Sequence, residues 1–345
     1  MTNNFHVGLV ADLLGPDGQV VFEEFGLDLL DKAGIPRMFL GEDRWPVTPD
    51  QLKDIDAIIS MGQPYTRESF SGVSRLALIA RTGVGFDMID LDAATEANVM
   101  VTITPEATQK PVASATLALM LGLCHQLIIK DKIVRDNDWD VRFDYMGCEI
   151  RGRTIGLIGM GMIGREVVRM LKPFEPGSIL VNDPVITEDE ADQLGIILVD
   201  KETLLRSSNF VTIHCPLTKY TRGLISEEDL RIMQKDSFLI NTARGAIVDQ
   251  KALTRALQEG WIRGAAIDVF SEEPPAKDDP ILSLPNIILS PHASAWTKEL
   301  FRDIGHDCVK AVLAVSRGEE PLHIVNKAVL GRPGLQDKLK KICEK

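Results

Sequence analysis

A glycine-rich turn between a short apolar run and a helical pattern constrains this fold more than any other feature. The turn, Gly159-Met-Gly161-Met-Ile-Gly164, follows the apolar run 154–158 and precedes the helical pattern 165–171. A strand, a G-x-G-x-x-G turn and a helix in this order are typical of the first βα unit of a dinucleotide-binding fold. We therefore expect a cofactor with a pyrophosphate at this turn.

Each position of the turn has a physical role in that interpretation. Gly159 permits the tight turn, Gly161 leaves no side chain between the backbone and the pyrophosphate, and Gly164 allows close packing of helix and sheet. The N–H groups and partial positive charge at the start of the helix attract phosphate. Met162 and Ile163 lie inside the turn and are expected to contact the cofactor as well.

The choice of cofactor follows from the next predicted strand. Asp183 comes 19 residues after Gly164, at the end of the run 179–182, where a carboxylate can accept hydrogen bonds from the adenosine ribose. Residues 184–193 contain four acids and no lysine or arginine. A ribose 2′-phosphate would meet only negative charge there, so the sequence predicts NAD rather than NADP.

Short β-like runs alternate with helical patterns along most of the chain, which predicts an α/β fold with parallel sheets. The runs before residue 105, with a helical pattern at 21–32 among them, predict one sheet; those after 153 predict six strands of a doubly wound, Rossmann-type sheet. The expected strands are 6–10, 37–40, 56–60, 76–81, 99–103, 154–158, 178–182, 210–214, 237–241, 264–269 and 287–290.

Two helical segments mark the boundary between the predicted domains. The amphipathic segment 109–137, with Pro111 at an early helical position, starts the second domain or joins the two. Another helical stretch, 296–316, lies beyond the last strand of the second sheet. The chain is therefore expected to return to its first domain, which would be discontinuous, and 327–345 is expected to be a tail with a short peripheral helix.

Composition limits the partners. The 345 residues carry 38 basic and 50 acidic side chains, a net charge of −12. That charge disfavours nucleic acid as a partner, and no apolar stretch approaches the length of a membrane span. The five cysteines form no C-x-x-C pair, so we predict reduced thiols in a cytoplasmic protein and no metal site.

Three polar residues follow later predicted strands, at the edge where open α/β sheets bind ligands. They are Arg244, Glu273 and His292. Addition of hydride to a carbonyl builds negative charge on oxygen, which an imidazolium can neutralise by donating a proton. A neighbouring carboxylate orients that imidazole, and an arginine can hold a substrate carboxylate as a planar fork. This set suits a 2-keto acid. From spacing alone two alternatives remain: Glu273 is a solvated surface charge, or His214 is the catalytic histidine.

Several longer segments resemble one family, the D-isomer-specific 2-hydroxyacid dehydrogenases. The resemblance covers roughly residues 55–326 in consistent order. It rests on the segments 156–164, 240–249, 266–274 and 290–293, together with 84–90 and the region around Trp139.

The resemblance implies roles for individual residues. Arg244 is implied as the substrate-binding arginine, Glu273 as the partner of the histidine, and His292 as the general acid/base. Backbone amides around Gly83, Val84 and Gly85 are implied to bind the substrate carboxylate. Further cofactor contacts are implied at His214, Cys215, Pro216, Thr221, Thr242, Ala243, Arg244, Asp268 and His292.

The resemblance also implies the organisation of the molecule. A flavodoxin-like α/β substrate domain would comprise residues 1–104 and 296–326, and the NAD-binding Rossmann domain residues 105–295, with a cleft that closes on the ligand. Family members are usually homodimers through the nucleotide domain, which makes 109–137 a candidate dimer element.

The substrate loop favours a small, uncharged side group. Relatives of the phosphoglycerate type tend to carry an extra arginine in this loop, where this chain has Ser60, Met61 and Gly62. We therefore expect a glyoxylate- or hydroxypyruvate-type substrate, with specificity also set by Trp296 unless that side chain is core packing. D-3-phosphoglycerate remains an alternative if Arg81 reads the phosphate. An NAD-sensing corepressor and a phosphite dehydrogenase are more distant alternatives.

Overall fold

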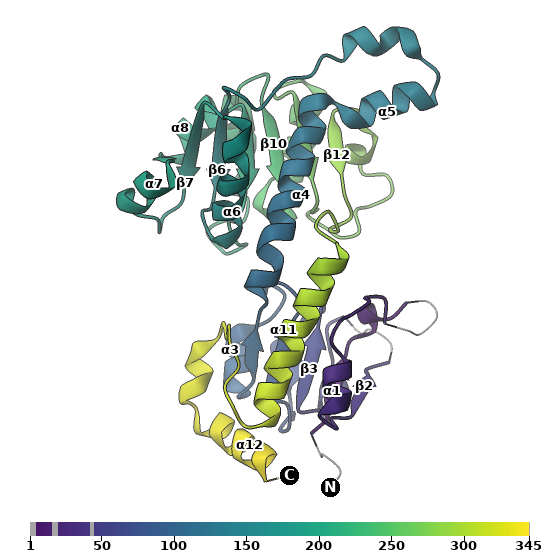
Figure 1. Cartoon of the computed structure of the whole chain (residues 1–345), viewed down its shortest axis with the longest axis vertical. Helices are drawn as coiled ribbons and strands as arrows, with labels where there is room; N and C mark the ends of the chain where they lie inside the picture. Colours follow the sequence, from purple (N-terminus) through teal and green to yellow (C-terminus); the bar gives the residue numbers. More distant parts are fainter. Residues whose placement is uncertain (1–4, 16–19, 42–44, 345) are drawn as a thin grey trace. The chain divides into compact units, whose positions relative to one another are not determined.

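The computed structural model describes residues 5–15, 20–41 and 45–344, which form two compact α/β units (Figure 1). One unit comprises the chain up to Thr108 together with Trp296 onward, and the other comprises Gln109–Ala295. The α/β class expected from the sequence is confirmed.

The first unit is built on a five-stranded parallel sheet in the order β2-β1-β3-β4-β5, which is the flavodoxin-like order. The strands are β1 (Val7–Leu9), β2 (Arg37–Phe39), β3 (Ala57–Ser60), β4 (Leu78–Arg81) and β5 (Met100–Thr102). The helices are α1 (Asp28–Lys32), α2 (Pro49–Leu52), α3 (Leu91–Glu96), α11 (Lys298–Ser316) and α12 (Pro333–Cys343), with 3-10 turns η1 (Ala11–Leu13), η2 (Arg67–Phe70) and η7 (Lys327–Gly331).

The prediction of a helix at 21–32 is wrong for its first half, which is not helical. Glu24 and Gly26 have positive φ angles of 58° and 87°, which a right-handed helix does not accept. Gly26 also approaches His306 so closely that an added Cβ would lie 2.5 Å from its ring. Tertiary packing therefore interrupts the apolar periodicity, and the helix is confined to α1.

The C-terminal tail is folded onto the first unit by two polar anchors. Asn326 donates to the Val99 carbonyl at 2.9 Å and accepts from the Val101 N–H at 3.0 Å. Lys338 of α12 donates to the carbonyls of Leu76, Ala97 and Asn98, at 2.6, 2.8 and 3.2 Å. Burial lowers the pKa of Lys338 to about 8. The expected helix is present, and the compact unit continues through it.

The second unit contains a seven-stranded parallel sheet in the order β12-β11-β10-β9-β6-β7-β8. The strands are β6 (Thr154–Ile158), β7 (Ser178–Asn182), β8 (Ile197–Leu198), β9 (Phe210–Ile213), β10 (Phe238–Asn241), β11 (Gly264–Ile267) and β12 (Ile287–Leu289). The sequence predicted six of them. It missed β8 because a two-residue edge strand is too short to show a periodic pattern.

Helices cover both faces of this sheet. The strand side chains alternate between two apolar clusters. Ile155 and Leu157 belong to the cluster that contains side chains of α4 and α6, whereas Ile158 belongs to the one that contains side chains of α8 and α10. The helices of the unit are α4 (Pro105–His125, which begins in the first unit), α5 (Leu127–Arg135), α6 (Met162–Leu171), α7 (Glu188–Leu194), α8 (Lys201–Ser207), α9 (Glu227–Ile232) and α10 (Gln250–Gln258). The 3-10 turns are η3 (Trp139–Asp144), η4 (Lys172–Phe174), η5 (Gly245–Ile247) and η6 (Pro280–Ser283).

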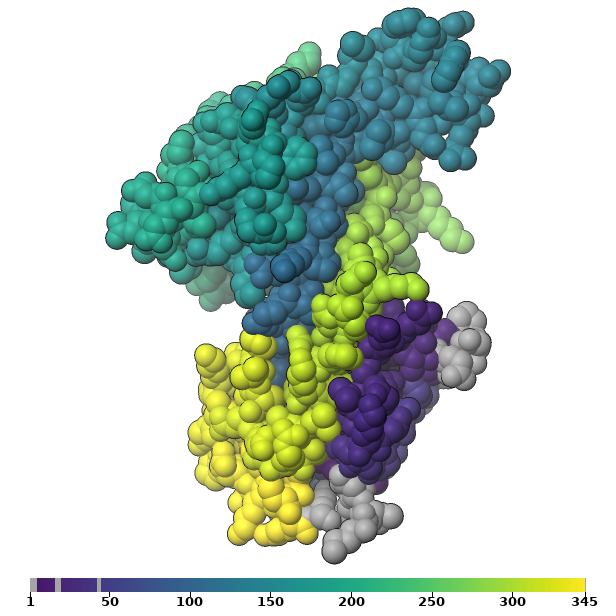
Figure 2. Space-filling model, viewed as in Figure 1, coloured from purple at the N-terminus to yellow at the C-terminus, as the bar shows by residue number. Residues whose placement is uncertain are grey.

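The segment expected as one helix at 109–137 is two helices. Gln126 adopts φ 53°, which ends α4 and starts α5 at an angle of 59°. Pro111 lies inside α4 rather than at an early position. Across the described residues, no single helix combines the length and apolarity needed to cross a membrane; α4 and α5 meet that test only as a bent pair. Figure 2 shows residues 126–147, hereafter the arm, projecting from the body of this unit.

Candidate active site

The carboxyl edge of the second sheet gathers most of the predicted site residues. Parallel strands all end at one edge, so residues that directly follow them lie along it. Gly159 follows β6, Asp183 follows β7, His214 follows β9, Thr242 follows β10 and Asp268 follows β11. Arg244 and His292 each lie three residues after their strands, β10 and β12.

The glycine turn has the geometry that its sequence predicts. Gly159 has φ 95°, and a Cβ there would lie 2.5 Å from the Cys215 nitrogen. A Cβ on Gly164 would lie 2.5 Å from the Gly159 carbonyl oxygen, whereas a Cβ on Gly161 would meet no atom within 4 Å. Gly159 and Gly164 are therefore required by the fold. Gly161 keeps open space, and α6 begins at the next residue, so the turn fits a pyrophosphate.

Asp183 is held at the end of β7 by backbone N–H groups. Its carboxylate accepts from Met160 at 2.7 Å, from Val185 at 2.8 Å and from Ile186 at 3.3 Å. Three fixed donors orient the carboxylate between the glycine turn and the loop that follows β7. That position is consistent with a contact to the ribose of a bound dinucleotide.

The segment after β9 is tied to the glycine turn and not to the other polar groups. His214 donates its backbone N–H to Ile158 at 2.7 Å, and its Nε2 lies 2.9 Å from Thr212 Oγ1. Burial lowers the pKa of His214 to about 4 and raises that of the Cys215 thiol to about 11. Both side chains are therefore neutral near pH 7. Thr221 donates to the Pro216 carbonyl at 2.6 Å, which closes the loop after Cys215.

Glu273 and His292 form the central pair. The distance from His292 Nδ1 to Glu273 Oε2 is 2.8 Å. Burial opposes ionisation of Glu273, but the hydrogen bonds from His292 and from the Phe270 N–H outweigh it, so its pKa lies below the ordinary value. An ionised carboxylate only accepts hydrogen bonds, so Nδ1 carries the proton and Nε2 is left for proton exchange. The rival His214 instead has the Thr212 hydroxyl beside its Nε2.

Asp268 braces the backbone that carries His292. This buried carboxylate accepts from the N–H groups of Ala293 and Ser294, both at 3.0 Å, and from the Ser294 hydroxyl at 2.7 Å. Its carbonyl also accepts the His292 N–H at 2.7 Å. The brace fixes a residue with φ 54°, a conformation that is rarely adopted outside glycine. Sequence reasoning missed this function, for which the only signal is an acid directly after a buried strand.

Arg244 sits in a turn that packs tightly against the segment of Glu273. Asn241 holds the turn, accepting from the Ala243 N–H at 3.0 Å and donating to the Arg244 carbonyl at 2.9 Å. A Cβ on Gly245 would lie 2.0 Å from the Phe270 carbonyl, so only glycine fits this approach. The positive charge of Arg244 helps to lower the pKa of Glu273. Next to this turn, Thr242 Oγ1 lies 3.1 Å from Thr116 Oγ1.

The predicted substrate turn belongs to the first unit. Gly83 has φ 127°, and its N–H donates to Thr104 Oγ1 at 2.9 Å. Arg81 folds back over Gly83 and donates to the Thr82 carbonyl at 2.6 Å. Val84 and Gly85 complete the turn.

The neighbouring substrate loop is held by the buried side chain of Gln63, and Trp296 packs in an aromatic cluster. Gln63 accepts from the Met61 N–H at 3.2 Å and donates to Asp12 at 2.6 Å. Trp296 is half exposed and makes edge-to-face contacts with Phe22 and Phe301, which favours the packing alternative for this side chain.

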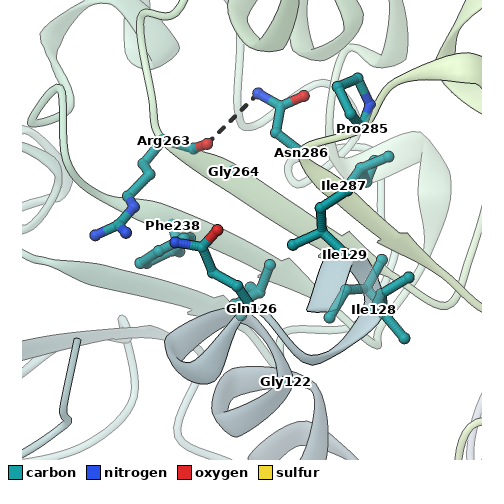
Figure 3. A pocket seen from close by; sticks show the side chains of 12 residues that line it. Gly122, Gln126, Ile128, Ile129, Phe238, Arg263, Gly264, Pro285, Asn286 and Ile287 are labelled. Carbon is teal, nitrogen blue, oxygen red and sulfur yellow. Dashed lines mark hydrogen bonds between the residues drawn. The ribbon is translucent and has the colours of Figure 1, made fainter. Parts of the chain in front are cut away.

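A pocket of about 120 Å³ lies at the opposite edge of the second sheet, away from these groups (Figure 3). Phe238, Gly264 and Ile287, the first residues of β10, β11 and β12, line it. It therefore takes no part in the arrangement around His292. Within the described ranges, no group of three or more His, Cys, Asp or Glu side chains is placed to hold a metal ion.

Known proteins share both sequence and fold with this chain. Residues 117–294 match the family model for the NAD-binding domain of D-isomer-specific 2-hydroxyacid dehydrogenases. Glyoxylate reductase of Korarchaeum cryptofilum is 38% identical over 91% of this chain and 94% of its own length. D-3-phosphoglycerate dehydrogenase of Methanocaldococcus jannaschii is also 38% identical, over 92% of this chain but only 59% of that longer protein.

A solved structure gives the same result. D-Lactate dehydrogenase of Aquifex aeolicus, in complex with NAD and lactic acid, matches with a TM-score of 0.79 and 29% identity, covering 91% of this chain and 96% of that one. The fold, the glycine turn and the extent of these matches all indicate the same family. The chain is an NAD-dependent oxidoreductase and belongs to the D-isomer-specific 2-hydroxyacid dehydrogenase family.

Proposed function

We propose that this enzyme interconverts a small 2-keto acid with an uncharged side group, of the glyoxylate or hydroxypyruvate type, and its D-2-hydroxy acid. The observation that carries the proposal is the 2.8 Å hydrogen bond between Glu273 and His292 at the carboxyl edge of the nucleotide-binding sheet. It leaves one protonatable nitrogen of a braced imidazole for the substrate.

In this proposal His292 is the general acid. NADH, when bound, supplies the hydride to the carbonyl carbon. Nε2 of His292 donates a proton to the carbonyl oxygen as negative charge develops there, and Glu273 stabilises the positive charge on the ring before transfer. In the oxidative direction the same nitrogen takes the hydroxyl proton.

Arg244 is assigned to the substrate carboxylate and the carbonyl oxygen. A guanidinium binds a carboxylate as a planar fork and polarises a neighbouring carbonyl. The amides of the 83–85 turn are assigned to the same carboxylate. Because the Gly83 N–H already donates to Thr104, Val84 and Gly85 are the donors we assign within that turn.

The preference for NADH over NADPH is assigned to Asp183 and the acids that follow it. The held carboxylate accepts hydrogen bonds from ribose hydroxyls but repels a 2′-phosphate. Asp183→Ser is expected to weaken NADH binding by about tenfold and NADPH binding less, whereas Asp236→Ser, at an exposed site two residues before β10, leaves both unchanged.

The uncharged side group is assigned from the substrate loop and Arg81. Ser60, Met61 and Gly62 offer no cation, and the Arg81 guanidinium is engaged with the backbone next to Gly83. A phosphate buried without a cation is costly. Glyoxylate reductase of Korarchaeum cryptofilum, which matches along almost its whole length, supports the same assignment.

Phosphohydroxypyruvate is the second candidate substrate, because a D-3-phosphoglycerate dehydrogenase is equally similar in sequence. The test is the loss of NADH absorbance with glyoxylate, hydroxypyruvate, pyruvate, an aromatic 2-keto acid and phosphohydroxypyruvate. The first proposal is supported by three results together. The kcat/KM is highest for glyoxylate or hydroxypyruvate, His292→Asn abolishes this activity, and His125→Asn, at an exposed site, retains it. Preference for phosphohydroxypyruvate overturns it in favour of the second, and tight NADH binding without turnover favours a binding protein of the corepressor type.

We further propose that the enzyme acts as a homodimer in the cytoplasm. The arm carries exposed apolar side chains, among them Trp139, Phe143 and Met146, that a second copy would cover. The five free cysteines fit a reducing compartment. Light scattering of the purified protein tests the dimer.

A further inference from the structure

Two cysteines flank the arm and meet at its base. Cys124 lies in the last turn of α4, and Cys148 directly follows the arm. The Cys148 N–H donates to the Cys124 carbonyl at 2.8 Å. The catalytic arrangement proposed above uses neither residue.

The backbone around the pair is fixed in close contact. A Cβ on Gly147 would lie 2.5 Å from the Cys124 carbonyl oxygen, so only glycine allows this approach. Gln126 donates to the Met146 carbonyl at 2.7 Å, and Arg263 donates to the same oxygen at 2.5 Å. Both donors line the small pocket in Figure 3. The backbone segments of the two cysteines are therefore held together by three hydrogen bonds and by the close approach of Gly147.

The distance between the two residues suits a covalent bond. A 2.8 Å hydrogen bond between the Cys148 nitrogen and the Cys124 carbonyl oxygen limits their Cα separation to about 6.7 Å by standard backbone geometry. Disulfides span Cα separations of about 4.4–6.8 Å. Both side chains pack in the same apolar cluster, and each thiol shifts the pKa of the other.

The surroundings of the two sulfur atoms differ. Interaction with the neighbouring Cys124 thiol lowers the pKa of Cys148 against the effect of burial. Arg153 and Arg263 lower it further, while Asp236, 3.6 Å from Arg153, opposes them. The same interaction and full burial raise the pKa of Cys124.

We propose that Cys124 and Cys148 form a reversible thiol–disulfide site, oxidised by a hydroperoxide and reduced by a dithiol. The partly exposed Cys148 thiolate attacks one oxygen of hydrogen peroxide, breaks the O–O bond and becomes a sulfenic acid as hydroxide leaves. The Cys124 sulfur attacks that sulfur, the S–S bond forms and water leaves. In total, two thiols and one peroxide give a disulfide and two waters, with two electrons passing from sulfur to oxygen.

The other cysteines do not compete for this chemistry. Burial raises the pKa of Cys215 to about 11 and also raises that of Cys308. Cys343 is exposed, and its thiol donates to the Arg317 carbonyl at 3.4 Å. The disulfide would close the arm into a covalent loop at its base, while α4 and the sheet keep their places.

The test uses the purified full-length protein, treated with hydrogen peroxide and then analysed for free thiols and by non-reducing peptide mass spectrometry. We expect the thiol count to fall from five to three, with a linked Cys124–Cys148 peptide two hydrogens lighter than the separate peptides. Dithiothreitol should restore all five thiols. Cys124→Ala should leave Cys148 as a sulfenic acid that a 1,3-dione traps. Cys343→Ser should still form the Cys124–Cys148 link, with its thiol count falling from four to two.

A second measurement is independent of disulfide formation. The alkylation rate of Cys148 should reach half its maximum at a pH below about 8.5, the ordinary value for a thiol, and Arg263→Gln should raise that midpoint. Any of three results would overturn the proposal: five thiols remaining after peroxide treatment, a Cys148–Cys343 or interchain disulfide, or an alkylation midpoint at or above the ordinary pKa of a thiol.

Discussion

Nδ1 of His292 donates a 2.8 Å hydrogen bond to the carboxylate of Glu273, from 19 residues further along the chain. Each partner is also held by a second contact: Phe270 donates to the other Glu273 oxygen at 3.0 Å, and the His292 N–H donates to the Asp268 carbonyl at 2.7 Å. The pair is therefore oriented before any substrate binds, which is the condition for efficient proton transfer.

Glu273→Gln removes the negative charge and keeps the shape. We expect kcat for keto-acid reduction to fall by about 100-fold, within the range for general acid–base groups, because the imidazolium loses its stabilising carboxylate. The alkaline limb of the pH–rate profile should move to lower pH. Glu272→Gln, at the exposed neighbouring site, is the control. An unchanged profile in the Glu273 variant would show that the pair has no part in proton transfer.

Gly161→Ala should separate cofactor binding from stability. A Cβ at this position meets no atom within 4 Å and the φ is −70°, so the protein should keep its thermal midpoint. The methyl group would occupy space assigned to the pyrophosphate, so NADH affinity measured by fluorescence titration should fall at least tenfold. Gly159→Ala, with φ 95° and a contact of 2.5 Å, should instead lower the thermal midpoint. Normal NADH affinity in Gly161→Ala would contradict the assignment.

His214 should make stability depend on pH. Its pKa is about 4 in the folded protein and about 6.5 in the unfolded chain. Between these values only the unfolded state binds the proton, so the free energy of unfolding should fall as pH decreases from 6.5 to 4, by on the order of 2 kcal/mol. Urea unfolding across this range measures the slope. His214→Asn should flatten it and exposed His125→Asn should not; equal slopes in both variants would refute the role of His214.

Lys338→Met should loosen the C-terminal helix. The substitution leaves the carbonyls of Leu76, Ala97 and Asn98 without this donor, and an unsatisfied buried acceptor costs about 1–3 kcal/mol. We expect a lower urea midpoint and faster proteolysis within α12. Lys340→Met, on the exposed side of the same helix, is the matched control. If the two variants behave alike, the three hydrogen bonds do not anchor the helix.

Patterns that depend on neighbouring residues were predictable from the sequence. The alternation of strands and helices and the G-x-G-x-x-G spacing indicated the α/β class, which the fold confirms. Features set by distant contacts were not predictable. The close approach of Gly26 to His306 accompanies the loss of the helix expected at 21–32, and the positive φ of Gln126 divides the segment expected as one helix.

The sequence by itself determined which residues follow the strands, because the end of an apolar run is a local signal. It placed Arg244, Glu273 and His292 among them, and the rival His214 at the end of a predicted strand. Only the tertiary structure decided that His292, and not His214, meets Glu273. The order of parallel strands in a sheet is set by packing, so it decides which strand ends become neighbours. The bracing of the His292 turn by Asp268 has the same origin, since β11 and β12 are adjacent in the sheet.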